Sequence, residues 1–236
     1  MTKTIIILES AIVVILCCFI CFLTFSSKET VNQDIYMEVS DFSYKWTFDA
    51  SEDMQLPELP TGCEATAAAT LCRMQGALVT KTMIADSLPK SYDDFVNSFI
   101  GDPYSYEGWS CSAKAMTRTL NDIFFSREEF AAIELTGDRL GKLVLPSAVW
   151  VSIGLTDPGE PSMVSDGYKL FHNTHCVVIK NIDDNNVYAV DPLRGKVTYN
   201  RVIFEQIYNK MGREAVHVGT LDDIVRLTQE RMNYGS

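Results

Sequence analysis

Cys63 lies where a proline-containing loop meets a helix, a position that can activate a thiol. Pro57 and Pro60 restrict the backbone and predict an extended loop, while the alanine-rich run 64–75 has high helix propensity and ends before Gly76, a natural C-cap. The first N–H groups of a helix favour a negative charge, and the thiolate is the reactive form of cysteine. The pattern offers Cys63 either as a nucleophile with a pKa below that of an ordinary thiol or as a small buried apolar residue.

A thiol nucleophile needs a base, and the chain has three histidines, His172, His175 and His217. His175 begins an apolar stretch that passes through the turn "DDNN" into a second one ending at Asp191. In a hairpin about that turn, paired residue numbers sum to roughly 369, so His175 and Asp191 fall near the same open end. A carboxylate there fixes the imidazole tautomer and stabilises its cation. We predict a Cys63–His175–Asp191 triad; alternatively, His175 is an exposed strand end and Asp191 a turn residue.

Gln55 supplies a fourth candidate group. It lies eight residues before Cys63 on the same loop. Its side-chain amide could join the backbone N–H of Cys63 in stabilising the oxyanion of a tetrahedral intermediate. An isolated glutamine would mean little, but the order Gln, Cys, His, Asp on a loop, a helix start and two strands is much rarer than any one member.

Two more features are relevant to the candidate site. Glu64 directly follows the thiol, where its charge opposes a thiolate unless the side chain points away along the helix. Tyr106 and Trp109 lie among glycines in a polar loop, where aromatic side chains either form the wall of a substrate-binding cleft or pack onto the domain.

The composition and motifs exclude several classes of function. The 236-residue chain has a formal net charge of -11 and no run of Lys and Arg, so we expect no nucleic-acid partner. The stretch "TGDRLGKL" lacks the glycine spacing of a phosphate loop, and Leu143 replaces the magnesium-binding Ser or Thr, so no nucleotide is expected. His172 and His175 form an HxxH pair without a third ligand at suitable spacing. We predict neither a metal nor a cofactor.

The N-terminus has the character of a membrane segment. Residues 5–25 are apolar apart from three positions, about the length of a membrane-spanning helix. Because large residues precede the possible cut, we predict an uncleaved signal-anchor, with cleavage after Ser26 or Ser27 as the alternative. Lys3 on one side and Lys28 followed by Glu29 on the other place the domain outside the cytoplasm by the positive-inside rule. The expected location is the cell membrane, single-pass with an extracellular domain, or secreted if the signal is cleaved.

The rest of the chain is helix-rich first and strand-rich later. Periodicity and boundary residues predict helices at 64–75, 81–87, 112–124, 201–212 and 222–232, and strands at 147–155, 176–182, 187–192 and 214–219. This is an α+β layout, with an N-terminal helical part packed on a C-terminal antiparallel sheet. The four cysteines after the membrane segment are too sparse for a disulfide framework, so we predict free thiols at Cys63, Cys72, Cys111 and Cys176.

Five stretches together resemble the papain-fold cysteine peptidase-like domains related to bacteriocin-processing, double-glycine peptidases. They are "QLPELPTGCEATAAATL", "GDP", "AVWVSIGL", "HCVVIKNIDDNNVYAVDPLRGKV" and "FEQIYNKMGREAV", and the resemblance runs from about Gln55 to Val216. It implies that Cys63 is the nucleophile, His175 the base, Asp191 its orienting partner and Gln55 the oxyanion glutamine. It also implies a bacterial surface protein, and it departs from exporter-linked members in having no transmembrane bundle or ATPase domain.

The expected organisation is a signal-anchor at 1–27, a stalk or edge strand at 28–50, a papain-like peptidase domain at 51–219 and a C-terminal helix or tail at 220–236. The expected function is that of a membrane-anchored extracytoplasmic cysteine peptidase acting on a peptide or protein. Two alternatives remain open: a catalytically silent surface module that binds peptide or wall polymer, and an amidase or transferase acting on cell-wall peptides with the same residues.

Overall fold

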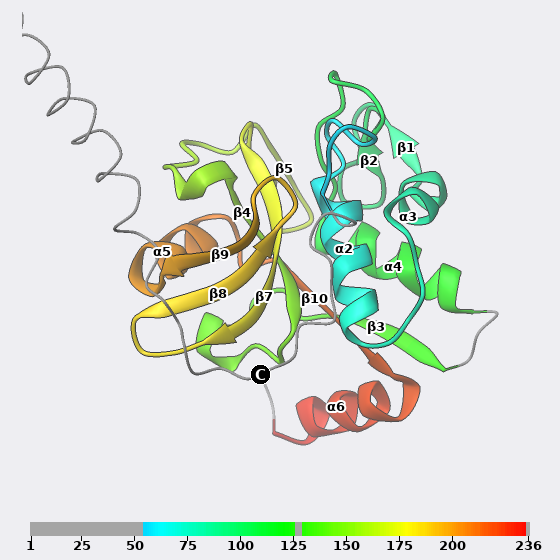
Figure 1. The fold of residues 1–236 in the computed structure, drawn as a ribbon, viewed down its shortest axis with the longest axis vertical. Helices are drawn as coiled ribbons and strands as arrows, with labels where there is room; N and C mark the ends of the chain where they lie inside the picture. The colour runs from blue at the N-terminus through cyan, green and yellow to red at the C-terminus, as the bar shows by residue number, and fades with distance from the viewer. Residues whose placement is uncertain (1–53, 126–128, 235–236) are drawn as a thin grey trace, which may run out of the picture. The chain divides into compact units, whose positions relative to one another are not determined.

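A computed structural model describes residues 54–125 and 129–234, which are built around a six-stranded sheet (Figure 1). Every neighbouring pair in this sheet is antiparallel. The strand order is β3 (Phe130–Glu134), β10 (Ala215–Thr220), β4 (Ser147–Ser152), β7 (Thr174–Ile182), β8 (Asn186–Asp191) and β9 (Gly195–Asn200). Two short pairs complete the strands: parallel β1 (Lys90–Ser91) with β2 (Phe99–Ile100), and antiparallel β5 (Met163–Ser165) with β6 (Tyr168–Leu170).

Helices cover both faces of the sheet. On one side, α2 (Cys63–Met74) packs on β7 and β4, α4 (Ala113–Phe124) packs on β3 and β10, and α3 (Lys81–Ser87) packs on α2. On the other side, α5 (Arg201–Lys210) packs on β4, β8 and β9 (Figure 1). The terminal helix α6 (Leu221–Tyr234) packs on β10 and β3.

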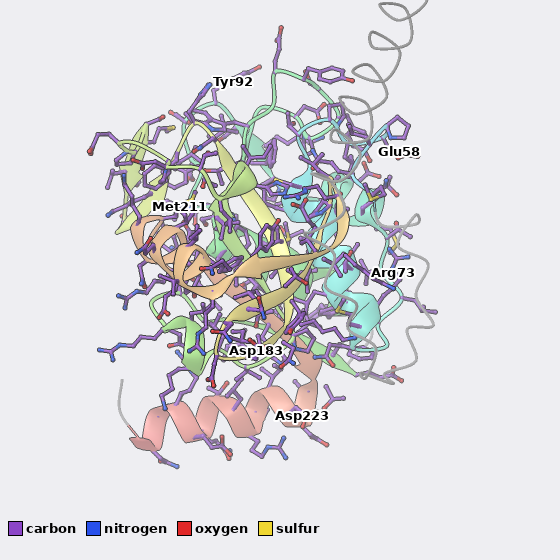
Figure 2. The ribbon with its side chains drawn as sticks, turned by 60° about the vertical axis from the view of Figure 1, so that its left-hand side comes forward. Glu58, Arg73, Tyr92, Asp183, Met211 and Asp223 are labelled. Atoms are coloured by element: carbon purple, nitrogen blue, oxygen red, sulfur yellow. The ribbon has the colours of Figure 1, made fainter. Side chains whose placement is uncertain are left out.

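The central strands are buried on both faces, which explains their continuous apolar sequences. Side chains of β4 and β7 alternate between two cores, as the period of a strand requires. The core beneath α2 and α4 receives Ala148, Trp150, Cys176 and Val178, and the core beneath α5 receives Val149, Val151, Val177 and Ile179. Figure 2 shows side chains filling the space between the sheet and the helices.

Most of the predicted elements are confirmed, with boundaries displaced by a few residues at most. Two strands of the main sheet were not predicted, β3 and β9. β9 reads "GKVTYN", where polar residues alternate with apolar ones as on a half-buried edge strand. The predicted free thiols are also found, because Cys63, Cys72, Cys111 and Cys176 are all buried and unbridged.

The predicted membrane segment and stalk lie outside the described residues. Among the helices within 54–125 and 129–234, none combines the length and the apolar character needed to cross a bilayer. The membrane segment therefore stays a prediction from sequence.

The loop before α2 differs from the expected extended conformation. The N–H of Leu59 donates to the carbonyl of Gln55 at 3.0 Å, and the N–H of Gly62 donates to that of Leu59 at 3.1 Å, so the backbone turns back twice. Gly62 is required at the second turn, because a Cβ there would lie 2.8 Å from the Cβ of Leu59. The other end of the helix follows expectation, with Gly76 at a φ of 87° after the last turn.

Glu214 is a buried acid just before β10. Its carboxylate accepts the backbone N–H of Ala113 at 2.7 Å, at the start of α4. Burial raises its pKa to about 8, against the lowering effect of that hydrogen bond. The folded protein therefore binds a proton here that the unfolded chain releases at lower pH.

We expect Glu214→Gln to flatten the pH dependence of stability, because the amide keeps an acceptor for Ala113 and removes the ionisation. A raised folded pKa means that the unfolding free energy falls as pH rises from the ordinary carboxyl value to about 8. Urea unfolding of the full-length protein should show the variant gaining on the parent across that range, on the order of 5 kcal/mol. Parallel stability curves for the two proteins would contradict this account of Glu214.

Candidate active site

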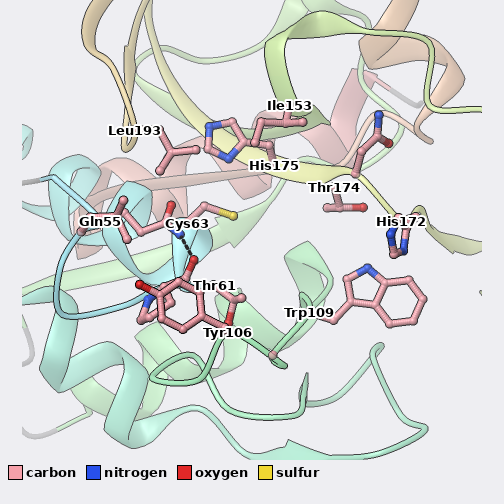
Figure 3. A pocket seen from close by; sticks show the side chains of 14 residues that line it. Gln55, Thr61, Cys63, Tyr106, Trp109, Ile153, His172, Thr174, His175 and Leu193 are labelled. Carbon is pink, nitrogen blue, oxygen red and sulfur yellow. Dashed lines mark hydrogen bonds between the residues drawn. The ribbon is translucent and has the colours of Figure 1, made fainter.

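A cavity of about 420 Å³ opens beside the start of α2. Five of the six predicted site residues line it: Gln55, Cys63, Tyr106, Trp109 and His175 (Figure 3). The sixth, Asp191, is hydrogen bonded to His175. Residues predicted from distant parts of the chain are thus brought together around one hollow.

His175 and Asp191 form a buried pair. The imidazole Nε2 lies 2.8 Å from Oδ1 of Asp191, and each residue is 2% exposed. Because a carboxylate accepts, this contact assigns the proton to Nε2 and leaves Nδ1 as the nitrogen available to a thiol. This is the arrangement that a base needs when it must take up a proton at one nitrogen and stay oriented at the other.

The register of β7 and β8 explains how the pair meets. Val178 lies opposite Val190, which by extension puts Asp191 opposite position 177, two residues from His175 on the same face. The pairing sum is 369 near the turn but 368 beyond an irregularity between Ile179 and Asn181. The predicted sum therefore holds only near the turn, yet the two residues still reach each other as diagonal neighbours.

Several donors keep Asp191 ionised. Oδ1 also accepts the N–H of Leu193 at 2.8 Å, and Oδ2 accepts the hydroxyl of Tyr199 at 2.7 Å. Burial alone would raise the pKa of Asp191, but the hydrogen bond and charge of His175, with Leu193 and Tyr199, hold it below its ordinary value. Tyr199 lies on β9, so the unpredicted strand also delivers an unpredicted site residue. The alternation of polar and apolar residues in β9 was the sequence signal that could have revealed this strand.

Both His172 and His175 line the cavity, but they differ in their partners. His172 lies edge-on to Trp109, with ring centroids 6.1 Å apart. His217 lies on β10 and its Nδ1 contacts the carbonyl of Pro146 at 2.7 Å. Among the three histidines, His175 is the one with a carboxylate hydrogen bond.

Cys63 is the first residue of α2, where its own N–H has no partner within the helix. The expectation of a lowered thiol pKa is wrong for this arrangement. Burial raises the pKa of Cys63 well above its ordinary value, and the charge of Glu64 raises it further. A hydrogen bond with the backbone of Cys176 acts against this rise.

Glu64 also departs from the simplest expectation, because its side chain does not point away from the thiol. Sγ of Cys63 donates to Oε2 of Glu64 at 3.3 Å, and the hydroxyl of Ser110 donates to Oε1. Glu64 is fully buried, and burial raises its pKa. Ser110 precedes α4 and was not singled out in the sequence, which holds no signal for this contact.

Gln55 is placed beside the thiol by two contacts of its own. Its backbone N–H donates to the carbonyl of Pro192, next to Asp191, at 2.8 Å. Its side-chain Nε2 donates to the carbonyl of Pro60 at 2.8 Å (Figure 3), and one amide hydrogen remains for another acceptor. The residue is 3% exposed, so this amide is held in a fixed position at the cavity wall.

The loop that bears Tyr106 and Trp109 is hydrogen bonded to the loop that precedes Cys63. The hydroxyl of Thr61 contacts the carbonyls of Asp102 and Ser105 at 3.3 and 2.9 Å. Gly108 closes this contact, because a Cβ there would lie 2.2 Å from Oγ1 of Thr61. The indole of Trp109 donates to the carbonyl of Phe171 at 3.0 Å, so Trp109 both packs on the domain and lines the cavity.

The chemistry available at this cavity is that of a thiol, an oriented imidazole and fixed N–H donors. Within residues 54–125 and 129–234, no group of three or more His, Cys, Asp or Glu side chains is suited to a metal ion. The set matches the requirements of nucleophilic attack on a carbonyl carbon.

Comparison with known proteins agrees with the chemistry of this cavity. The model of the Peptidase_C39-like family matches residues 41–216, a segment that contains Gln55, Cys63, His175 and Asp191. No curated protein matches the chain in sequence.

Two solved structures are similar. A protein from Bacillus anthracis described as a C39-like peptidase is 25% identical, with a TM-score of 0.62 over 69% of this chain and 90% of that one. A double-glycine motif protease from an AMS/PCAT transporter, solved with its leader peptide, is 14% identical over 71% of this chain and 89% of that one, with a TM-score of 0.45. The family match spans most of the chain and includes all the residues that line the cavity. The protein is therefore a cysteine peptidase of the Peptidase_C39-like family.

Proposed function

We propose that the protein hydrolyses peptide bonds with Cys63 as nucleophile, His175 as general base and acid, and Asp191 as the group that orients His175. The observation that carries this proposal is the buried His175–Asp191 hydrogen bond beside a cavity that Cys63 also lines. Gln55 and the N–H of Cys63 are the proposed oxyanion donors, since Gln55 lines the cavity and Cys63 is the first residue of α2.

The proposed reaction has two stages. Nδ1 of His175 takes the thiol proton while Sγ of Cys63 attacks the carbonyl carbon, and the oxyanion is stabilised by the amide donors. The imidazolium then protonates the leaving amine, which leaves an acyl-thioester on Cys63. Water, deprotonated by His175, releases the acid and restores the thiol. Asp191 holds the imidazole in place throughout and stabilises its cationic form.

The proposed substrate is a peptide or protein outside the cytoplasm. The side chains that line the cavity include no Asp, Glu, Lys or Arg within the described part of the chain, so its recognition rests on apolar, aromatic and hydrogen-bonding contacts. Anchoring to the membrane through residues 5–25 is part of the proposal and rests on their apolar sequence.

We expect His175→Ala to reduce turnover by roughly 100- to 10,000-fold, the range for loss of a general acid–base group. Asp191→Asn should cost less, because the imidazole remains but is poorly oriented, and Cys63→Ala should abolish turnover. The measurement is kcat/KM on the best-cleaved member of a peptide library, with circular dichroism to confirm folding.

His172→Ala is the comparison variant for this series, since His172 lines the same cavity without a carboxylate partner. Its effect should be far smaller than that of His175→Ala. If His172→Ala silences the protein while His175→Ala stays active, the base has been assigned to the wrong histidine.

We expect Tyr106→Ala to lower kcat/KM by about 2- to 10-fold, since an aromatic contact contributes roughly 0.5–1.5 kcal/mol. Tyr106 lines the cavity and is 84% exposed, so its removal should leave stability unchanged. Tyr92 is the matched control, because it is 94% exposed, projects from the surface and does not line the cavity (Figure 2). Equal kcat/KM values for Tyr106→Ala and Tyr92→Ala would exclude Tyr106 from substrate binding.

A further inference from the structure

Glu64 is a fully buried acid in direct contact with the sulfur of Cys63. Its Oε2 accepts from Sγ at 3.3 Å, and its Oε1 accepts from the hydroxyl of Ser110. Both partners are neutral donors. The proposed mechanism gives Glu64 no role, although an ionised carboxylate in this position opposes the thiolate that the mechanism requires.

The groups around Glu64 leave a single source of positive charge. Cys63 shares its helix, Ser110 and Cys111 come from the segment before α4, His175 and Cys176 come from β7, and Glu214 comes from the segment before β10. Of these, His175 is the one that can become a cation. Burial raises the pKa of Glu64, and the hydrogen bond from Ser110 and the charge of His175 act against that rise.

Whether the thiol of Cys63 can ionise depends on the protonation state of Glu64. When Glu64 is ionised, the thiol donates to it, as in the observed geometry, and two adjacent negative charges would result if the thiol lost its proton. When Glu64 is protonated, its O–H can donate to the sulfur, which stabilises the thiolate.

We propose that Glu64 is a positioning residue that must carry a proton for Cys63 to become a thiolate. This inference rests on the proposed function of Cys63 and His175. In the activating step the S–H bond breaks and its proton moves to Nδ1 of His175, whose Nε2–H stays on Asp191. The proton of Glu64 stays on its oxygen, and the hydrogen bond to the sulfur reverses from S–H···O to O–H···S⁻.

Cys63 is therefore more reactive just below the pH at which Glu64 ionises than just above it. As pH rises through the pKa of Glu64, its carboxylate captures the thiol proton in a hydrogen bond and the reactivity of Cys63 falls. At still higher pH the thiol ionises without help, and reactivity rises again.

The test is the rate of alkylation of Cys63 by iodoacetamide in the full-length protein, read by mass spectrometry of the Cys63 peptide from about pH 5 to about pH 10. The parent protein should show reactivity at mildly acidic pH, a fall, and a second rise. Glu64→Gln keeps an acceptor for Ser110 and an N–H donor for the sulfur, so its reactivity should persist without the fall. It should be at least about tenfold above the parent where the parent is lowest.

Glu214→Gln is the matched control, since it neutralises another buried glutamate that accepts from a backbone N–H rather than from Cys63. Its alkylation profile should keep the fall and the second rise of the parent, with the fall displaced toward lower pH because one negative charge near Glu64 is removed. Identical profiles for the parent, Glu64→Gln and Glu214→Gln would overturn the proposal.

Ser110→Ala provides a second route if Glu64→Gln does not fold. Loss of the serine hydroxyl removes a donor that favours ionised Glu64, so the fall in reactivity should move to higher pH. An unmoved fall would also overturn the proposal. His175→Ala separates this inference from the proposed function: if that variant alkylates like the parent at mildly acidic pH, the catalytic pair itself is wrong. If it slows while Glu64→Gln changes nothing, only the role of Glu64 is wrong.

Discussion

The close packing of α2 on β7 and β4 is the constraint on which the site depends. Every residue of α2 from Cys63 to Cys72 is buried, and four of them are alanines, at positions 65, 67, 68 and 69. Small side chains let a helix approach a sheet closely, and added volume in such a contact forces backbone shifts. Cys63 begins the helix and His175 lies near the beginning of β7, so this approach decides whether thiol and imidazole meet.

The three buried acids show how the hydrogen-bond donors around a buried carboxyl group affect its pKa. Asp191 receives the His175 ring, a backbone N–H and a hydroxyl, and its pKa is lowered. Glu214 receives one backbone N–H and its pKa is raised to about 8. Glu64 receives a thiol and a hydroxyl, and its pKa is also raised. Two unit charges about 4 Å apart repel by roughly 4 kcal/mol at an effective dielectric constant near 20, so Glu64 strongly affects its neighbour.

Sequence patterns predicted the elements better than the contacts between them. The helix at 81–87 and the strands at 176–182 and 187–192 follow from periodicity and turn residues, which are local properties. The candidate histidine and its carboxylate could be paired because a hairpin relates residue numbers simply. Edge strand β9 has a weak pattern, and its Tyr199 could not be linked to Asp191 before that strand was known.

Contacts between distant segments explain the remaining differences. The direction of the Glu64 side chain is set by Ser110, 46 residues away, and this contact leaves no trace in local sequence. The loop from Gln55 turns because its carbonyls find backbone partners within it, whereas proline content alone suggested an extended course. The pKa of Cys63 likewise depends on burial that a helix-terminus argument does not include.

The Thr61 contacts with Asp102 and Ser105 have a mechanical consequence. They join the segment bearing Tyr106 to the segment that ends at Cys63, with Gly108 leaving no slack between them. The segment that bears Tyr106, at the rim of the cavity, is therefore coupled by these hydrogen bonds to the loop that ends at Cys63. A peptide that pushed this rim outward would therefore also strain the loop that ends at Cys63.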